Sequence, residues 1–334
     1  MIAYLRARSL GGKVIMRMED LDHPKDKPGA AAQAIEDLKW LGFDWDEEYV
    51  QSERKPLYAA ATKALFEAGH IYPCVCSRRD VETAQSAPHA GEQLYYPGTC
   101  RDRFSTWSEA AECKRRFAVA GDDNKRTTTR TTTAVQPSTS NLQPASPCWR
   151  FRVPEGTVVE FDDVFAGHCS QDVAATLGDF PLARDEGGAG YTLAAVYDDL
   201  AMGVTEVVRG DDLLAATPAQ LLLARALLQS TNLRISESTN QNIDHRCPPP
   251  PFFSTYLHVP LVTGPDGKRL AKRHGDTRVA TFREQGIPPE RVLGFLAASC
   301  GWCREGEAIS LAGLLPRFDL GTVPHRPFTV RKFF

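Results

Sequence analysis

Arg17-Met18-Glu19-Asp20-Leu21-Asp22 places three carboxylates at the end of a short apolar run, residues 13–18 (KVIMRM). That run is typical of a β-strand that ends in charge. In open α/β sheets, ligands bind at the carboxyl ends of the strands. Carboxylates in this position are suited to holding the ammonium group of a substrate. The alternative is a solvated turn with a helix-capping aspartate.

Outward from this stretch, strand-like and helical patterns alternate along the chain. Strand-like pieces occur in residues 151–173 and 190–209. Helices are expected at residues 28–41, at residues 56–68, from Thr217-Pro218, and from Pro289 to Gly301. The alternation predicts an α/β core. Residues 120–147 and 231–251 are polar and break the pattern, which is typical of flexible insertions.

Length and composition fit a globular protein with a sizeable core. The chain has 334 residues, 42% hydrophobic and 24% charged residues, and a formal net charge of −3. The negative charge argues against nonspecific coating of nucleic acid but permits a local basic face. No run of 18 apolar residues appears, and the N-terminus lacks the apolar core of a signal peptide. We therefore expect no membrane association and a cytoplasmic location.

Three of the nine cysteines lie close together in the sequence and suggest a metal site. The odd count argues against a full disulfide framework, and Cys300 and Cys303 follow an apolar helical pattern that predicts buried or inert thiols. Cys74 and Cys76 are one residue apart, and Cys100 returns after a loop. Thiolates suit tetrahedral zinc, which needs a fourth ligand.

The spacing leaves several choices open for this cysteine cluster. The fourth ligand could be Tyr96, His89 or His70. Three unconnected buried thiols are the plain alternative. A catalytic cysteine is a weaker one, because no base or orienting partner is identifiable.

A glycine-rich turn leads into a cationic loop at residues 264–274 (GPDGKRLAKRH). Such a loop suits a polyphosphate whose charge shifts during attack on the α-phosphorus. An ordinary basic surface loop is the alternative.

Four segments, in this order, resemble the glutamate branch of class I aminoacyl-tRNA synthetases. Residues 17–22 resemble that family's RIEDLD segment, and residues 37–46 (DLKWLGFDWD) its DL-x-WLG-x-DWDE stretch. Residues 204–213 (VTEVVRGDDL) resemble its VTEVVRG-x-DLL run, and residues 269–273 (RLAKR) its KMSKS loop. Each match is weak alone, but together they are specific and cover most of the chain apart from the two polar stretches.

Within this branch, the chain is similar to the short glutamyl-Q tRNA(Asp) synthetases. It ends soon after the KMSKS-like loop and one helical region, which leaves no room for an anticodon-binding domain. Cys74, Cys76, Tyr96 and Cys100 match the subfamily's C-x-C…Y-x-x-x-C zinc pattern.

The resemblance implies a Rossmann-like class I catalytic core with a small zinc-bearing insertion and a short C-terminal helical region. Residues 1–72 would form the first half of the core and residues 73–150 the insertion, including a disordered stretch at 120–147. Residues 151–287 would form the second half, with the KMSKS-like loop at 269–273. Residues 288–334 would form the helical region.

The resemblance also implies a two-step reaction. L-glutamate would attack the α-phosphate of ATP, with magnesium expected, and the glutamyl group would then pass to queuosine at the wobble position of tRNA(Asp). Glu19 would hold the substrate amino group, Tyr191 and Arg209 would line the glutamate pocket, and Lys272 would contact ATP as a catalytic residue. The partners would be the anticodon loop of tRNA(Asp), L-glutamate and ATP, and we expect a monomer.

The sequence departs from the family at its start and in its loop. The family opens with a strand and a HIGH-type signature, whereas residues 1–5 resemble the back of the helix that follows it, so we expect this chain to be poorly active. Arg269 and Ala271 replace the usual lysine and serine of the loop. A truncated glutamyl-tRNA synthetase charging tRNA(Glu) and a noncatalytic remnant are the rival functions.

Overall fold

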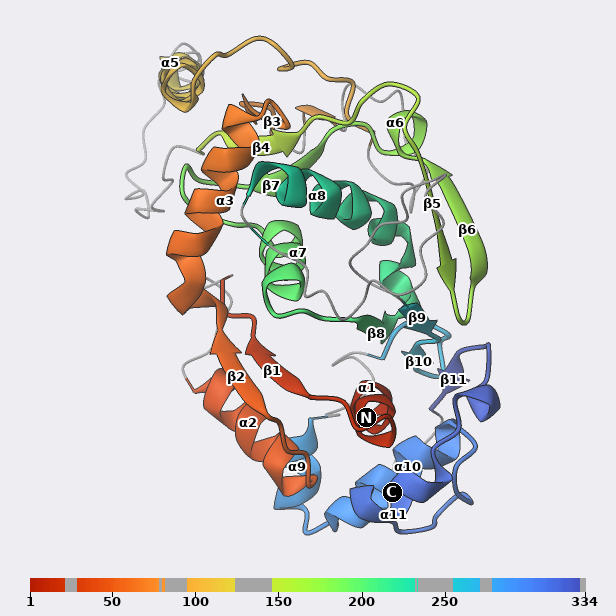
Figure 1. The fold of residues 1–334 in the computed structure, drawn as a ribbon. Coiled ribbons are helices and arrows are strands. Elements are labelled where there is room, and N and C mark those ends of the chain that lie inside the picture. Colours follow the sequence, from red (N-terminus) through yellow and green to blue (C-terminus); the bar gives the residue numbers. More distant parts are fainter. Residues whose placement is uncertain are drawn as a thin grey trace, which may run out of the picture.

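The computed structural model describes residues 1–21, 29–77, 80–81, 95–123, 146–231, 233, 255–270 and 278–330, and the side chains of 117–123 are not included. Most of the predicted insertions at 120–147 and 231–251, together with Asp22, His89 and Lys272, lie outside these residues. Figure 1 shows the sheet β3–β4–β7 at one end of the molecule and the C-terminal helices at the other.

Parallel strands carry the central part of the fold, in two sheets. β1 (Ile15–Met18) pairs with β2 (Glu47–Val50), which confirms the strand expected before the acidic stretch. The second sheet has the order β6–β5–β9–β8, in which β8 (Glu206–Gly210) and β5 (Val158–Asp163) both run parallel to β9 (Thr255–Val259). β6 (Gly167–Asp172) is the antiparallel edge.

Helices pack around these strands, and most begin where the sequence predicts. Those expected at residues 28–41, 56–68, 217 and 289 are α2 (Ala30–Trp40), α3 (Lys55–Glu67), α8 (Thr217–Ser230) and α10 (Pro289–Ser299). Proline lies in the first turn of the last three, where its missing N–H costs nothing. Shorter helical segments are α1 (Ile2–Ser9), η2 (Gln51–Arg54), α6 (Val173–Thr176), η3 (Asp211–Ala216), α9 (Val279–Glu284), α11 (Leu311–Leu314), η6 (Leu315–Arg317) and η7 (Leu320–Thr322).

One predicted strand-like segment is wrong in its first part. Residues 191–201 form helix α7 (Tyr191–Ala201), and only Glu206–Gly210 is a strand. Leu193, Val196 and Leu200 are buried at the three- and four-residue spacing of a helix, in the main hydrophobic core. The aromatic and β-branched residues of this segment favoured a strand, and burial against α3 and α8 overrides that propensity.

A smaller antiparallel sheet closes the other end of the core. β4 (Cys148–Phe151) lies between β3 (Ile71–Cys74) and β7 (Phe180–Ala183). Because β3 and β4 pair, the segment between them leaves and re-enters the core at adjacent strands. It contains α5 (Trp107–Asp123), so residues 120–123 are helical and the predicted polar stretch does not begin at residue 120.

The chain has a main core and a second core that joins its two ends. Leu5 and Leu41 pack with Leu293, Leu314 and other buried residues of the C-terminal region. That region also contains β11 (Phe328–Thr329), which pairs in parallel with β10 (Val262–Thr263). Cys300 is buried in this core, which confirms that part of the prediction, whereas Cys303 is only partly buried and its thiol donates to the carbonyl of Gly294. Within the described ranges, no helix has the length and apolar character needed to cross a bilayer.

Candidate functional site

Three of the predicted site residues lie at the ends of elements that face one region. Glu19 follows β1 directly, Arg209 lies near the carboxyl end of β8, and Tyr191 begins α7 with 48% of its surface exposed. Burial raises the pKa of the Tyr191 phenol, and the charge of Glu19 raises it further, whereas that of Arg209 lowers it. These charges therefore act on the same hydroxyl.

Glu19 belongs to an ion network that the sequence pattern does not predict. Arg17 donates to one Glu19 carboxylate oxygen from Nε at 3.2 Å and from Nη2 at 3.1 Å. The same guanidinium donates to Asp199 on α7 at 2.5 Å. Burial raises the pKa of Asp199, so this carboxyl depends on Arg17 for its negative charge. Arg17 thus joins the end of β1 to α7 and fixes the orientation of Glu19.

Asp20, in contrast, has the structural, helix-capping role that is the alternative interpretation of the acidic stretch. Its carboxylate accepts hydrogen bonds from the Ser52 backbone amide at 2.8 Å and hydroxyl at 2.6 Å. These bonds hold the start of η2 against the end of β1. Glu19 is therefore the one carboxylate of the acidic stretch, among the described residues, that is left to face a ligand.

Arg209 is a partly buried cation whose hydrogen bonds go to uncharged groups. Its Nε donates to His258 Nε2 at 3.0 Å and its Nη2 to Thr217 Oγ1 at 2.8 Å. Over the part of the chain that the structure describes, no carboxylate forms an ion pair with it, and Nη1 makes no hydrogen bond. Burial lowers the pKa of the guanidinium below its usual value. A planar, partly desolvated guanidinium of this kind suits a substrate carboxylate.

The cationic loop is described only at its beginning. Arg269 is exposed and pairs with Asp212 Oδ2 at 2.8 Å, close to the end of β8. Lys272, the predicted ATP-contacting residue, lies outside the described residues. The pairing of Arg269 nevertheless shows that the start of this loop lies next to η3, beyond the carboxyl end of β8.

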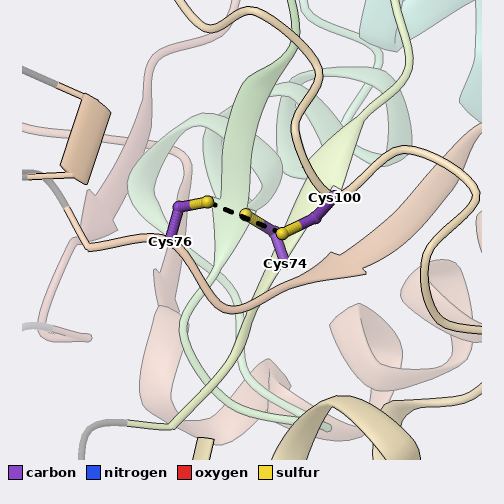
Figure 2. A group of neighbouring side chains, drawn as sticks. All are labelled: Cys74, Cys76 and Cys100. Atoms are coloured by element: carbon purple, nitrogen blue, oxygen red, sulfur yellow. Dashed lines mark hydrogen bonds between the residues drawn. The ribbon is translucent and has the colours of Figure 1, made fainter. Parts of the chain in front are cut away.

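The three predicted cysteines converge on one point, as Figure 2 shows. Cys74 ends β3, Cys76 follows it, and the sulfur atoms of these two and Cys100 all lie within 4.8 Å of one another. Tyr96 Oη is 3.3 Å from the Cys74 sulfur and 3.6 Å from that of Cys76, and 3.5 Å separates the sulfurs of Cys76 and Cys100. Ligand atoms of a tetrahedral zinc ion lie about 3.5–3.8 Å apart, so these three separations are close to that spacing, and the three thiols fit the ion in chemistry.

The position of Tyr96 distinguishes it from the other candidates for a fourth ligand. The Cys100 backbone amide donates to Tyr96 Oη at 2.9 Å, which directs the oxygen toward the sulfurs. Tyr96 also forms an isolated bridge with Gly178, where an added Cβ would lie 2.4 Å from the Tyr96 carbonyl, so only glycine allows this approach. His70 stacks on Phe151 outside the cluster, and His89 is not among the described residues.

Arg150 supplies positive charge beside the sulfurs. Its Nε donates to the Cys74 sulfur at 3.2 Å, and its guanidinium carbon lies 3.7 Å from the centre of the Tyr96 ring. Hydrogen bonding with Cys100 lowers the pKa of Cys74 and raises that of Cys76. The surroundings therefore favour the thiolate at Cys74 and the neutral thiol at Cys76.

Sequence patterns did not reveal several residues that organise this region. Arg17, Asp199, Asp163, His258 and Arg150 make polar contacts across more than 75 positions of sequence. One signal was available for Arg150 and His258, since a charged or titratable residue within an apolar strand implies a buried partner.

The chain belongs to the class I tRNA synthetase family of the glutamate and glutamine branch. The family model described as the catalytic domain of class I tRNA synthetases (E and Q) matches residues 1–247. Members of this family are ligases, and the predicted resemblance is confirmed.

The chain is similar to two curated proteins named glutamyl-Q tRNA(Asp) synthetase. The protein from Rhodopirellula baltica is 39% identical, and the match covers 100% of this chain and 91% of the relative. The protein from Symbiobacterium thermophilum is 38% identical, over 99% of this chain and 89% of the relative.

A solved structure shows that the fold is that of a class I synthetase. The glutamate tRNA ligase from Elizabethkingia meningosepticum, crystallised with its amino acid, superposes with a TM-score of 0.67 at 23% identity. The match covers 98% of this chain, which spans 62% of that ligase.

Proposed function

We propose that this protein activates L-glutamate with ATP and transfers the glutamyl group to queuosine at the wobble position of tRNA(Asp). In the first step, a glutamate carboxylate oxygen bonds to the α-phosphorus of ATP and pyrophosphate leaves. In the second, a nucleophile of the queuosine base bonds to the activated carbonyl carbon and AMP leaves. Magnesium is expected to accompany ATP.

The observation that carries the glutamate part is the environment of Arg209. This guanidinium is partly buried, is hydrogen-bonded only to neutral groups among the described residues, and has Nη1 available. In our proposal it binds a carboxylate of the substrate, Glu19 binds the ammonium group, and Tyr191 lines the pocket between them. Lys272 contacts ATP from the cationic loop.

The acceptor part rests on the relatives of similar length. Two proteins named glutamyl-Q tRNA(Asp) synthetase match this chain over about nine tenths of their own lengths. The ordinary glutamate tRNA ligase that shares the fold is considerably longer than the matched part. We infer that the bound RNA element is the anticodon loop, whose unpaired bases can be splayed out for recognition.

The cysteine cluster is proposed to hold one zinc ion through Cys74, Cys76, Tyr96 and Cys100. Zinc would act there as a structural cross-link, because all four positions of its tetrahedron are filled by protein atoms. It would hold β3 and the returning loop together next to β4.

The test is an acceptor assay with radiolabelled glutamate. We expect incorporation into tRNA(Asp) that carries queuosine, and none into tRNA(Asp) with guanosine at that position or into tRNA(Glu). The assay is run on the 334-residue chain and, in parallel, on any in-frame extension upstream of Met1. Charging of tRNA(Glu) would favour the ordinary synthetase. Glutamate binding without any transfer or pyrophosphate exchange would favour a noncatalytic role.

A further inference from the structure

A buried aspartate–histidine pair lies directly behind Arg209. The side chains of Asp163 on β5 and His258 on β9 are both 0% exposed. Asp163 Oδ2 lies 2.7 Å from His258 Nδ1 and also accepts the backbone amide of His258 at 3.0 Å. The opposite ring nitrogen, Nε2, accepts the Nε–H of Arg209 at 3.0 Å.

The chemistry of these contacts fixes the tautomer of His258. A guanidinium can only donate, so Nε2 must carry a lone pair and the ring proton must be on Nδ1, where it is donated to Asp163. Thr217 Oγ1 lies 3.1 Å from the same Nε2 and accepts from Arg209 Nη2. Arg209 is thus held at two nitrogens by groups that are themselves held in place.

We propose that Asp163 and His258 are positioning residues for substrate binding: they hold Arg209 in the orientation in which its remaining edge grips the carboxylate of glutamate. This inference rests on the proposed role of Arg209 in the glutamate pocket. Asp163 acts through the tautomer and orientation of His258, and His258 acts through the guanidinium.

Replacing Asp163 by asparagine separates this role from simple packing. Asp163 Oδ1 accepts the backbone amides of Phe165 and Ala166 at 2.9 and 2.8 Å, while Oδ2 accepts both donors of His258. An asparagine has one acceptor oxygen and cannot serve both sets. If the amide oxygen of the introduced asparagine stays with the two turn amides, the amide NH2 group faces His258 Nδ1. Nδ1 must then accept a hydrogen bond, so the ring proton moves to Nε2. The Nε2–H group then opposes the Nε–H group of Arg209.

Protonation of His258 should have the same effect. Burial lowers its pKa, Asp163 and Asp211 raise it, and Arg209 lowers it; Tyr256 stacks beside it on the same strand. At neutral pH the ring is therefore neutral, as its acceptor role requires. Protonation, which burial shifts to a lower pH than for an ordinary histidine by lowering the pKa of the ring, would remove that acceptor from Arg209.

The experiment measures the dissociation constant of L-glutamate by calorimetric titration of the 334-residue protein. The variants are Arg209→Ala, Asp163→Asn, His258→Phe and His258→Gln, whose amide oxygen can still accept from Arg209. His168→Phe and Asp162→Asn are matched controls, because they form a chemically identical but exposed pair, 2.9 Å apart, on the neighbouring strands. The tautomer is read from the ¹⁵N shifts of the His258 ring, assigned by its loss in His258→Gln.

We expect Asp163→Asn and His258→Phe to weaken glutamate binding about tenfold, His258→Gln to recover part of the loss, and both controls to bind normally. The ring proton should move from Nδ1 to Nε2 in Asp163→Asn, and wild-type affinity should fall as the pH drops through the lowered pKa of His258. Unchanged affinity in Arg209→Ala would overturn the proposed pocket itself. Weak binding by Arg209→Ala with normal binding by Asp163→Asn and His258→Phe would overturn the positioning role alone. An unchanged tautomer in a folded but weakly binding Asp163→Asn protein would also overturn it.

Discussion

In the proposed site, Arg209 is the residue on which the choice of amino acid would most directly depend. Its Nε and Nη2 atoms already donate to His258 and Thr217, so the edge of the guanidinium that remains for a substrate is the one that carries Nη1. Arg209→Ala should therefore weaken glutamate binding by about 1.5–3 kcal/mol, the value of a charge-assisted hydrogen bond. Arg209→Lys should recover little, because an ammonium lacks the planar fork.

The measurement is glutamate titration together with thermal unfolding of each variant. Arg152→Ala is the matched control, since Arg152 forms a solvent-accessible ion pair with Asp102 and makes no contact with the described residues of the proposed pocket. An Arg209→Ala protein that unfolds early and binds glutamate normally would assign this residue to stability instead.

His258 should also give the protein a recognisable pH dependence of stability. Burial lowers the folded-state pKa of this imidazole below the unfolded value near 6.5. As the pH falls below 6.5 the unfolded chain therefore binds the proton first, and the free energy of unfolding decreases, by at most about 1.4 kcal/mol per pH unit. Above pH 6.5 this contribution is fully present.

The measurement is the free energy of unfolding in urea at pH 7.5 and at pH 5.5. The change between the two pH values is compared between the wild type and His258→Gln. His70, whose pKa is also lowered by burial, contributes with the same sign to both proteins and cancels in the difference. A wild-type protein that loses no more stability than His258→Gln over this range would show that the buried pair does not titrate on unfolding.

At the scale of elements, α3 and α7 are locked together by one buried carboxylate. Asp198 is 0% exposed and accepts from Arg54 Nε at 2.8 Å, Tyr58 Oη at 2.7 Å and Gln51 Nε2 at 3.2 Å. Removing it leaves a partly buried cation and two buried donors unpaired. Asp198→Ala should therefore cost about 3–5 kcal/mol of unfolding free energy.

Chemical denaturation checks this expectation, with Asp162→Ala as the control. Asp162 is exposed on β5, so its removal should change stability by less than about 0.5 kcal/mol. Equal stability of the two variants would mean that water replaces the lost carboxylate. Because α7 also carries Tyr191 and Asp199, partial loosening of α7 should weaken glutamate binding as well.

The cysteine cluster joins β3 to the loop that returns to β4, so zinc binding should require ligands from both segments. The wild-type protein is expected to contain about one zinc ion per chain, and Cys100→Ser much less. Cys113→Ser is the matched control, since this thiol lies on α5 outside the cluster. Chelation should lower the unfolding temperature of the wild type and of the control, but not of Cys100→Ser.

Metal analysis by mass spectrometry and thermal unfolding supply both readouts. Equal zinc content in the wild type and Cys100→Ser would contradict the proposed zinc site. Arg150→Met adds a further distinction, because it deletes the cation beside the Cys74 sulfur and keeps all four ligands. We expect it to retain zinc more weakly, by about the 10–100-fold seen for outer-shell partners of metals.

Elements were predictable where their signal is local. Proline and glycine at the ends of α3, and apolar spacing in α2 and α10, identify these helices without any tertiary information. The segment of α7 is instead predicted to be strand-like, because a short, half-apolar segment favours a strand when the packing of α3 and α8 against it is not known. The cysteine pattern is local in the same sense, whereas Arg17–Asp199 and Asp163–His258 join residues 182 and 95 positions apart, so only the folded chain brings them together.

At the scale of the whole molecule, the two ends of the chain share one core, and α1, which contributes Leu5 to this core, contacts the strand β8 that carries Arg209. Leu5 and Leu41 pack with Leu293 and Leu314, and Arg6 on α1 forms a bidentate ion pair with Glu206 at the start of β8. The strand that carries Arg209 is thereby tied to the N-terminal helix. Glutamate binding and global unfolding should be coupled through this arrangement, so saturating glutamate should raise the unfolding temperature.

The proposed acceptor makes a further demand on the whole molecule, because the wobble base must enter the same site as the activated glutamate. Contacts that matter for binding should then be concentrated on the anticodon arm. We expect the isolated anticodon stem–loop of tRNA(Asp) with queuosine to compete with the full tRNA within about tenfold in affinity, and the acceptor arm alone to compete hardly at all. Because the net charge of −3 permits a basic face only locally, binding should depend moderately on salt, reflecting a few phosphate contacts. Competition titrations at two salt concentrations, with the anticodon stem–loop of tRNA(Glu) as the matched control, measure both quantities.

Preference for the acceptor arm would place the RNA as an ordinary glutamate tRNA ligase does and would contradict transfer to the wobble base. Equal binding of both stem–loops would show that the loop is held by its backbone and that selection occurs at the transfer step.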